Sequence, residues 1–234
     1  MKQKFVRSPS AAFVALVLIG STLTANAAES TNPQVSKEWK PLFDAKTLTG
    51  WRSLKSETPG EGWKVVNGVL TTSGKAGDLL TTEQFGDFEI SVEWKIAEAG
   101  NSGIIYRVGL NEDATYHTGP EYQLLDNAKA ADNKLPNHLA GSLYDLVAPT
   151  KDVTKPVGDW NVSRIVVRGW QVEHWLNGVK LLEADLAKPD GKALVAGSKF
   201  KTMPKFATLS RGHIALQDHG DVVSFRNILI RELK

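Results

Sequence analysis

The sequence predicts an all-β fold, an antiparallel two-sheet sandwich or jelly roll. Residues Phe88–Ile96 alternate between apolar and polar side chains, which is typical of a strand with one buried face. Asn67-Gly68 and Asn177-Gly178 each separate two short apolar runs, the strongest short-range signal for a β-hairpin. No window sustains a helical period. Short strands separated by turn signals therefore favour a sandwich.

The expected strands follow one another along the chain. In Phe88–Ile96 the apolar side chains at even positions face one side and the polar side chains at odd positions face the other. The other expected strands are Trp63–Leu70 with its hairpin turn, Leu79-Leu80, Ile104–Val108, Glu121–Leu125, Trp160–Val167, the hairpin Gln171–Leu182, His213–Gln217 and Val222–Ile230. Two irregular segments, Asn127–Val157 and Leu186–Phe206, separate some of them. Long ordered loops such as the first usually carry function.

Residues 1–27 have the features of a cleaved signal peptide. A basic region precedes the apolar stretch Ala11–Gly20, which is too short for a stable membrane anchor, and Ala25-Asn26-Ala27 fits a cleavage site. We expect residues 28–38 to form a flexible lead-in and residues 39–234 to form a single domain. The expected location is the periplasm or the outside of the cell, with no transmembrane anchor in the mature chain.

Composition narrows the function classes. Removal of residues 1–27 leaves 207 residues and lowers Lys plus Arg from 28 to 25, against 26 Asp plus Glu. The formal net charge thereby changes from +2 to −1, so nothing indicates a nucleic-acid partner. The absence of cysteine excludes thiolate metal sites and cysteine nucleophiles. Because disulfides are also excluded, burial of the apolar core has to stabilise the fold. Zinc-hydrolase spacings, a Gly-rich phosphate loop and a G-x-S-x-G motif are also absent.

The stretch Pro120–Asn127 carries the first candidate site residues. Alternation along this expected strand places Glu121 and Gln123 on one face, and Asp126 on the other with the neighbouring apolar residues. In His213–His219 the same alternation places Gln217 and His219 together. A concave sheet surface with such side chains suits a sugar, because hydroxyls bind amides and carboxylates and ring faces stack on aromatic residues such as Tyr144, Trp160 or Trp51.

Ionisable and polar residues in or beside apolar strands, or in the Pro-rich loop, are the site candidates. They are Asn101, Arg107, Glu121, Gln123, Asp126, His138, Tyr144, Asp145, Trp160, Gln217, Asp218, His219 and Arg226. Some of them also have structural interpretations. Arg107 could form an ion pair with Glu121 or Asp126, and Asp218–Asp221 could be a polar turn. His174 lies in an expected hairpin, so we expect it to face solvent.

Several motifs occur together in the order that one family shows. They are Gly100–Ile104 with Arg107, Pro120–Asn127, Gly141–Asp145, Trp160-Asn161, His174–Gly178, Ile214–Gly220 and Phe225–Ile228. The chain therefore resembles the 3-keto-disaccharide hydrolase family, formerly a domain of unknown function, from about Trp39 to Leu233. The resemblance implies a concanavalin A/laminin G-like jelly roll. It also implies action on 3-keto-glycosides, which a partner oxidoreductase forms by oxidising the sugar at C3.

The chemistry of such a substrate indicates which residue types are needed. The C3 ketone acidifies the C2 hydrogen, a base removes it, a donor binds the enolate oxygen, and an acid helps the C1 group to leave before water adds. Glu121 and His219 are the first candidates for base and acid, and Asp126 and His138 follow. Each such group contributes roughly 10²–10⁴-fold. The candidate donors are Asn101, Arg107 and Gln123. No cofactor is certain, and a divalent metal could replace the donor.

Two other functions remain open from the sequence. The first is a non-catalytic carbohydrate-binding module, because this architecture often only binds. The second is a conventional glycoside hydrolase, which needs two carboxylates on either side of the glycosidic bond. Glu121 and Asp126 lie on opposite faces of their strand, which argues against that particular pair.

Overall fold

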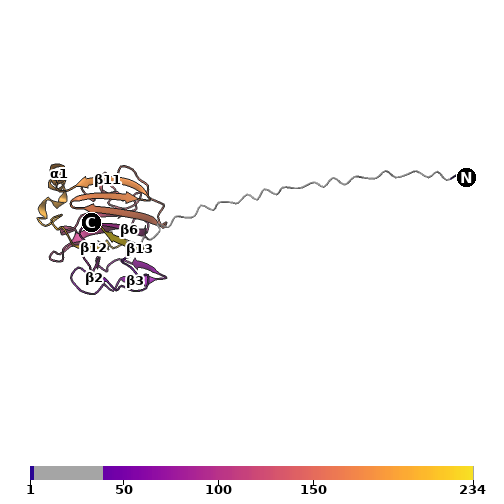
Figure 1. The fold of residues 1–234 in the computed structure, drawn as a ribbon, viewed down its shortest axis with the longest axis horizontal. Helices are drawn as coiled ribbons and strands as arrows, with labels where there is room; N and C mark the ends of the chain where they lie inside the picture. The colour runs from indigo at the N-terminus through magenta and orange to yellow at the C-terminus, as the bar shows by residue number, and fades with distance from the viewer. Residues whose placement is uncertain (3–38, 234) are drawn as a thin grey trace. The chain divides into compact units, whose positions relative to one another are not determined.

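The computed structural model describes residues 1–2 and 39–233. Apart from its first two residues, the predicted signal peptide lies outside the described residues, as does the predicted lead-in 28–38. Residues 39–233 fold as two antiparallel β-sheets with few helices, so the predicted all-β sandwich is confirmed (Figure 1).

The larger sheet, sheet A, holds eight strands. Seven are ordered β11 (Val179–Asp185), β10 (Gln171–Leu176), β9 (Asn161–Arg168), β6 (Phe88–Ile96), β13 (Val223–Glu232), β4 (Val69–Thr72) and β3 (Trp63–Val66), and β1 (Lys40–Pro41) pairs with β13. Both predicted hairpins are present, β3–β4 and β10–β11. Asn67, Gly68, Asn177 and Gly178 all have positive φ, as the tight turns of Asn-Gly hairpins require.

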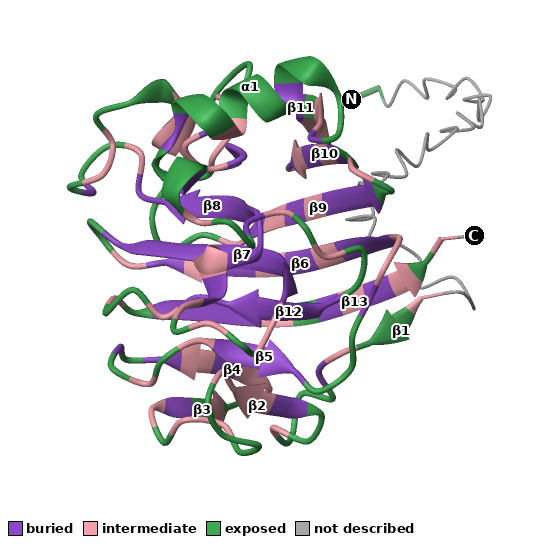
Figure 2. Ribbon diagram, turned by 90° about the vertical axis from the view of Figure 1, so that its left-hand side faces the viewer, coloured by how far each residue is buried: buried purple, intermediate pink, exposed green. Residues whose placement is uncertain are grey.

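The smaller sheet, sheet B, holds five strands. Their order is β2 (Trp51–Ser53), β5 (Leu79–Thr81), β12 (His213–Leu216), β7 (Asn101–Val108) and β8 (Glu121–Leu125). Every residue of β7 and β8 is buried, which shows that both faces of these strands are covered. Figure 2 shows this continuous burial along β8, β7 and β12.

The two sheets enclose one apolar core. The even-numbered side chains of β6 are buried, as their alternation predicted, and Phe88 meets Tyr106 of β7 edge to face at 6.2 Å between ring centroids. A smaller apolar cluster lies outside this core. It consists of Leu80, Ile105, Val108 and Ala215 on the outer face of sheet B, and Leu54, Leu110 and Tyr116 pack against it.

His174 lies inside the core, so the predicted solvent exposure was wrong. His174 lies on the same face of β10 as the buried Val172 and Leu176, and this face packs against sheet B. The His174 ring is 4.6 Å from the Tyr122 ring, and its nitrogens lie within hydrogen-bond distance of the Tyr106 hydroxyl (3.3 Å) and the Gly141 carbonyl (3.2 Å). Burial lowers the pKa of His174 to about 4.

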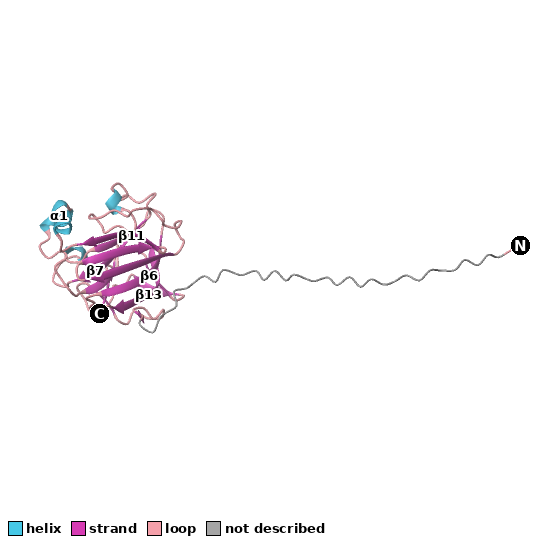
Figure 3. Ribbon diagram, turned by 45° about the horizontal axis from the view of Figure 1, so that its top comes forward, coloured by secondary structure: helices cyan, strands magenta, loops and turns pink. Residues whose placement is uncertain are grey.

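Two irregular segments cover the rest of the outer face of sheet B. In the first, residues 141–144 run along β8, where the amide of Gly141 donates to the Gln123 carbonyl at 2.8 Å and that of Tyr144 donates to the Glu121 carbonyl at 3.0 Å. The second, predicted as a loop, contains a helix, α1 (Pro189–Gly197), followed by the 3-10 helix η3 (Lys199–Thr202). Pro189 begins α1 at a position that proline favours. Figure 3 shows the helices to one side of the strands.

The buried His174 predicts a loss of stability in mild acid. The unfolded chain binds a proton at His174 below about pH 6.5, whereas the folded chain binds one only below about pH 4, so stability falls as pH decreases through this window. The expected loss is ~1.4 kcal/mol per pH unit. We expect His174→Gln to flatten this dependence, measured as the urea unfolding free energy at pH 7 and pH 5. Equal pH slopes for both proteins would contradict the assignment.

Candidate functional site

A cavity opens on the polar part of the outer face of sheet B. Its volume is about 180 Å³. The lining residues come from β7, β8, the end of β12, the two covering segments and the 3-10 helix η1 (Thr115–His117). They are Asn101, Tyr116, Glu121, Gln123, Asp132, Tyr144, Lys199, Gln217 and His219. We call this space the sheet B cavity.

Glu121 lies at the floor of the sheet B cavity. Gly103 on the adjacent strand β7 makes room for it, because a Cβ atom at position 103 would stand 2.3 Å from Oε1 of Glu121. Burial raises the pKa of Glu121 to about 8, opposed by Lys199 and assisted by the carboxylates of Asp78 and Asp132. A carboxyl group with this pKa exchanges protons near neutral pH, as general acid–base chemistry requires.

Buried amide groups beside Glu121 lack hydrogen-bond partners. Among the described residues, Oδ1 of Asn101, both side-chain polar atoms of Gln123 and Oε1 of Gln217 are buried without a partner. Buried polar atoms in folded proteins are almost always satisfied, and each one left unpaired costs about 1–3 kcal/mol. Amides offer both donors and acceptors, which match sugar hydroxyls. The three amides therefore indicate a polyhydroxylated ligand.

A hydrogen-bonded cluster forms one wall of the sheet B cavity, beside β8. The two ring nitrogens of His138 face Oδ1 of Asp132 at 2.7 Å and Oδ1 of Asp145 at 3.1 Å. The Tyr144 hydroxyl donates to Oδ2 of Asp132 at 2.8 Å, and the His138 and Tyr144 rings stack at 4.4 Å. Burial and the Asp132 carboxylate raise the pKa of Tyr144, so its hydroxyl stays protonated. Asp132 and Tyr144 line the cavity, and His138 and Asp145 support them from behind.

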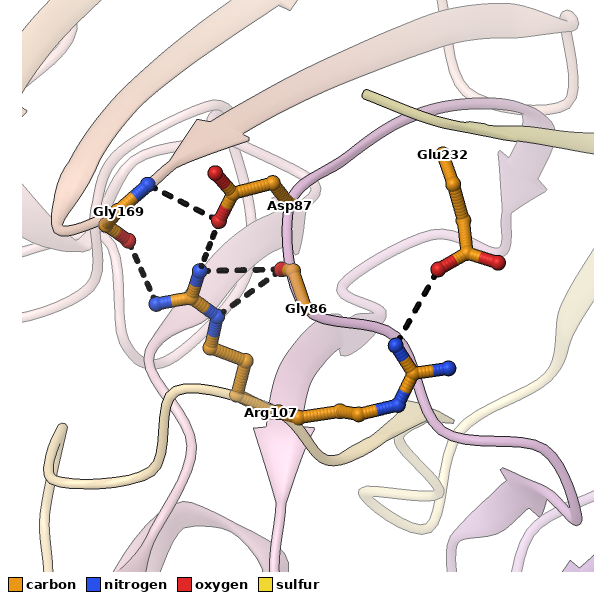
Figure 4. A network of polar contacts seen from close by, with 6 residues as sticks. Gly86, Asp87, Arg107, Gly169 and Glu232 are labelled. Atoms are coloured by element: carbon orange, nitrogen blue, oxygen red, sulfur yellow. Dashed lines mark hydrogen bonds and ion pairs between the residues drawn. The ribbon is translucent and has the colours of Figure 1, made fainter. Parts of the chain in front are cut away.

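Arg107 lies outside the sheet B cavity, so the prediction that it is one of the site residues was wrong. Its guanidinium donates to the carbonyls of Gly86 and Gly169 and pairs with Asp87 at 3.0 Å (Figure 4). Arg107 has a φ of +55°, and the pairing of β7 with β12 shifts register next to it. This irregularity interrupts the regular alternation of β7 at Arg107. Arg107 does form a structural ion pair, although with a different partner from those we considered.

Asp126 and Asp218 are also outside the cavity lining and bind backbone amides instead. Oδ1 of Asp126 accepts from Ala128 at 3.0 Å, and its Oδ2 accepts from Ala99 at 2.8 Å. Oδ2 of Asp218 accepts from Gly77 at 3.0 Å, and its Oδ1 accepts from Gly220 at 3.0 Å. Carboxylates used in this way fix turns. The structure thus gives both residues a structural explanation in place of the predicted site role.

Trp160 and Arg226 lie on a different surface, associated with sheet A. The Arg226 guanidinium stacks 4.1 Å from the Trp160 ring, and its Nε donates to Glu93 at 2.7 Å. Glu93 points away from the core on β6, so this group belongs to the outer face of sheet A. The predicted aromatic platform for the sugar therefore does not include Trp160. Trp51 is buried in the core.

The structure brings together Asn101, Glu121, Gln123, Tyr144, Gln217 and His219, and places His138 and Asp145 directly behind them. The roles of these residues stay predictions. Sequence reasoning missed Gly103, Asp132 and Lys199. A glycine inside an apolar strand signals a close approach, so Gly103 could have been noticed. The other two lie in irregular segments without any periodic signal.

No metal-binding cluster is present among the described residues. Within that part of the chain, no three His, Asp or Glu side chains gather as metal ligands do. A divalent metal in the reaction stays an open prediction. No helix in the described ranges is long and apolar enough to cross a membrane.

Comparison with known proteins places the chain in a family. Residues 38–231 match the family described as the 3-keto-alpha-glucoside-1,2-lyase-like domain. The chain belongs to this family. It is 34% identical over 227 residues to a 3-keto-disaccharide hydrolase from Bacteroides thetaiotaomicron, an alignment that covers 82% of this chain and 77% of that protein. The family membership predicted from the motifs is confirmed.

Solved structures agree with this placement. The chain is 32% identical to a proposed glycosyl hydrolase from Parabacteroides distasonis, with a TM-score of 0.79 over 84% of this chain and 94% of the other. A second proposed glycosyl hydrolase from that organism is 30% identical, with a TM-score of 0.68 over 83% of this chain and 99% of the other. A Bacillus subtilis protein with a galectin-like fold, 15% identical over 83% of this chain and 94% of that chain with a TM-score of 0.51, shares the fold alone.

Glu121→Gln tests the burial of the carboxyl group. Because the folded-state pKa is raised from 4.5 to about 8, the folded chain keeps a proton that the unfolded chain loses, and stability falls as pH rises from about 4.5 to about 8. The neutral amide removes this loss. We therefore expect Glu121→Gln to gain stability over the natural chain as pH rises through this window, measured by urea unfolding at pH 5 and pH 8. A variant that loses stability equally at both values would contradict this.

Proposed function

We propose that this protein cleaves 3-keto-glycosides, with 3-keto-disaccharides as the substrate class. The observation that carries the proposal is the buried Glu121 carboxyl with a pKa near 8, surrounded by three amides with unpaired atoms in the sheet B cavity. A base that works near neutral pH and a set of hydroxyl-binding groups are what this chemistry needs. Membership of the family and the name of its Bacteroides relative support the same substrate class.

The proposed reaction begins at C2 of the keto sugar. Glu121 takes the C2 proton, and the electron pair of that C–H bond forms the enolate with the C3 carbonyl. Collapse of the enolate re-forms the ketone, creates a C1–C2 double bond and expels the C1 oxygen, which takes a proton from an acid. Water then adds its hydroxyl to C1 and its proton to C2. His219, which lines the same cavity and is exposed, fits the acid because it reaches both solvent and substrate.

A second cavity adjoins the first and supports a substrate of two rings. Its volume is about 430 Å³, and it shares Asn101, Asp132, Tyr144 and His219 with the sheet B cavity. The additional lining residues are Ala99, Ala131 and Asp221. The keto sugar occupies the sheet B cavity beside Glu121, and the leaving group occupies this wider cavity. The shared residues then surround the bond that breaks, which is where His219 is needed.

A conventional glycoside hydrolase is the second candidate function. Asp126 is committed to backbone amides, but Asp132 lines the sheet B cavity together with Glu121 and could act as the second carboxylate. This alternative predicts cleavage of the unoxidised sugar. A carbohydrate-binding module, the remaining alternative, predicts binding without turnover.

Export and a partner enzyme complete the proposal. The basic and apolar regions of residues 1–27 support a cleaved signal peptide, and therefore action in the periplasm or outside the cell. The substrate requires an oxidoreductase that oxidises the C3 hydroxyl of the glycoside, which gives this protein a functional partner without requiring physical contact.

The decisive assay compares one disaccharide in its natural form and with its C3 hydroxyl oxidised. We expect cleavage of the keto form alone, with kcat/KM rising as pH increases towards about 8, because the base must lose its proton to act. Glu121→Gln should lower turnover by at least ~10²-fold while the keto-disaccharide still binds. Cleavage of the natural disaccharide would support the conventional mechanism, and binding of either form without turnover would support the binding module.

Ala131→Trp tests where the leaving group lies. The indole would fill the wider cavity, so KM for a 3-keto-disaccharide should rise by at least ~10-fold, as steric mismatches of this size do. The KM for a methyl 3-keto-glucoside should change little. Ala128→Trp is the matched control, because Ala128 is equally exposed but lines a separate cavity. Equal effects of Ala131→Trp on both substrates would refute this placement.

A further inference from the structure

Arg107 is the one cation among the predicted donors to the enolate oxygen, and it lies outside the sheet B cavity. One positively charged side chain other than histidine lines the sheet B cavity within the described residues, and it is Lys199. Lys199 is the first residue of η3, in a segment predicted as an irregular loop. Its position at the cavity is a product of tertiary structure, and nothing in its sequence neighbourhood indicates it.

Aromatic rings hold the Lys199 ammonium group at the cavity. Nζ lies 4.2 Å from the centroid of the Tyr144 ring and 5.2 Å from that of the Tyr116 ring, and both tyrosines line the cavity. A third ring, Phe200, lies at 5.2 Å. Ammonium groups are attracted to ring faces at such distances. This attraction holds the flexible lysine side chain at the cavity and leaves its three N–H donors available for hydrogen bonds.

The Lys199 donors are free for a ligand. Among the described residues, its ammonium group makes no hydrogen bond and no ion pair, whereas Lys129, Lys180 and Lys205 each pair with a glutamate. In particular, no contact within 4.0 Å joins Lys199 to Glu121. The long-range attraction of Lys199 nevertheless lowers the pKa of Glu121, against the larger effect of burial. The two groups therefore act on the same space from separate positions.

The backbone at Lys199 is fixed by the cluster that forms the cavity wall. Oδ2 of Asp145 accepts a hydrogen bond from the Lys199 amide at 2.8 Å, while Oδ1 of the same carboxylate faces His138 at 3.1 Å. The next residue, Phe200, is buried and stacks on Phe206 at 3.9 Å. Asp145 thus connects the base of the lysine side chain to the wall of the cavity, which explains why Asp145 lies near the site without lining it.

We propose that Lys199 is a further catalytic residue, whose ammonium group binds the C3 oxygen of the keto sugar as that oxygen becomes an enolate. This inference rests on the proposed function. When Glu121 takes the C2 proton, one negative charge moves from its carboxylate to the C3 oxygen, and the total charge is conserved. A cation speeds this step only if it is closer to the C3 oxygen than to the carboxylate. No ion pair ties Lys199 to Glu121, so its ammonium group is free to lie closer to the C3 oxygen than to the carboxylate.

The test separates proton abstraction from departure of the C1 group. A 3-keto-1,5-anhydroglucitol carries no exocyclic oxygen at C1, so it has no glycosidic bond to cleave, but its C2 hydrogen exchanges with deuterium in D₂O when the enolate forms. We expect Lys199→Met to lower both the exchange rate and kcat on a 3-keto-disaccharide by at least ~10²-fold, the usual effect of losing an oxyanion donor. Lys199→Arg should recover part of both rates, because it keeps the charge and the donors.

Lys201→Met is the matched control, because Lys201 is exposed on the same 3-10 helix and does not line the cavity. The exchange rate and kcat of Lys201→Met should stay within about twofold of those of the natural chain, whereas loss of an oxyanion donor lowers them by ~10²-fold. Normal exchange with slow cleavage in Lys199→Met would assign Lys199 to the leaving group and overturn the proposal. A loss that disappears at higher pH would reduce Lys199 to a modulator of Glu121, which also overturns it. A natural chain inactive on both substrates would instead refute the proposed function itself.

Discussion

Sheet B is buried on both of its faces, and the candidate site depends on this constraint. Its inner face packs against sheet A and supplies part of the core. Its outer face is covered partly by Leu54, Leu110 and Tyr116, which pack on Leu80 and Ile105, and partly by the segments that carry Tyr144 and Lys199. The same strands therefore obtain rigidity from one face and present polar groups on the other. A site on rigid strands holds its geometry better than one on loops alone.

The polar groups under this cover reduce the stability of the free protein. Glu121 loses hydration, and the amide atoms of Gln123 and Gln217 have no partners among the described residues. Each unpaired group costs about 1–3 kcal/mol, which the apolar core has to offset. Folds that keep such groups do so where a ligand restores the missing hydrogen bonds. The instability and the proposed sugar binding are thus two consequences of the same arrangement.

Strand alternation and turn chemistry made much of the molecule predictable. The Asn-Gly pairs located both hairpins, because few other residues adopt positive φ so readily. The two-residue period of a strand put Glu121 and Gln123 on one face, whereas Gln217 and His219 follow the end of β12. Antiparallel pairing within sheet B then brought all four side chains to one cavity. These features depend on local backbone geometry, which a sequence encodes directly.

Sequence by itself determined the fold class, the family and the polar face of β8, because periodicity and co-linear motifs are local properties. Only the tertiary structure decided the rest. A register shift lies beside Arg107, which points out of the site, and the packing of sheet B over β10 buried His174. Asp132 and Lys199 reached the cavity from segments far apart in the chain. Their positions depend on how loops fold over a sheet, and no short-range pattern records long-range packing of that kind.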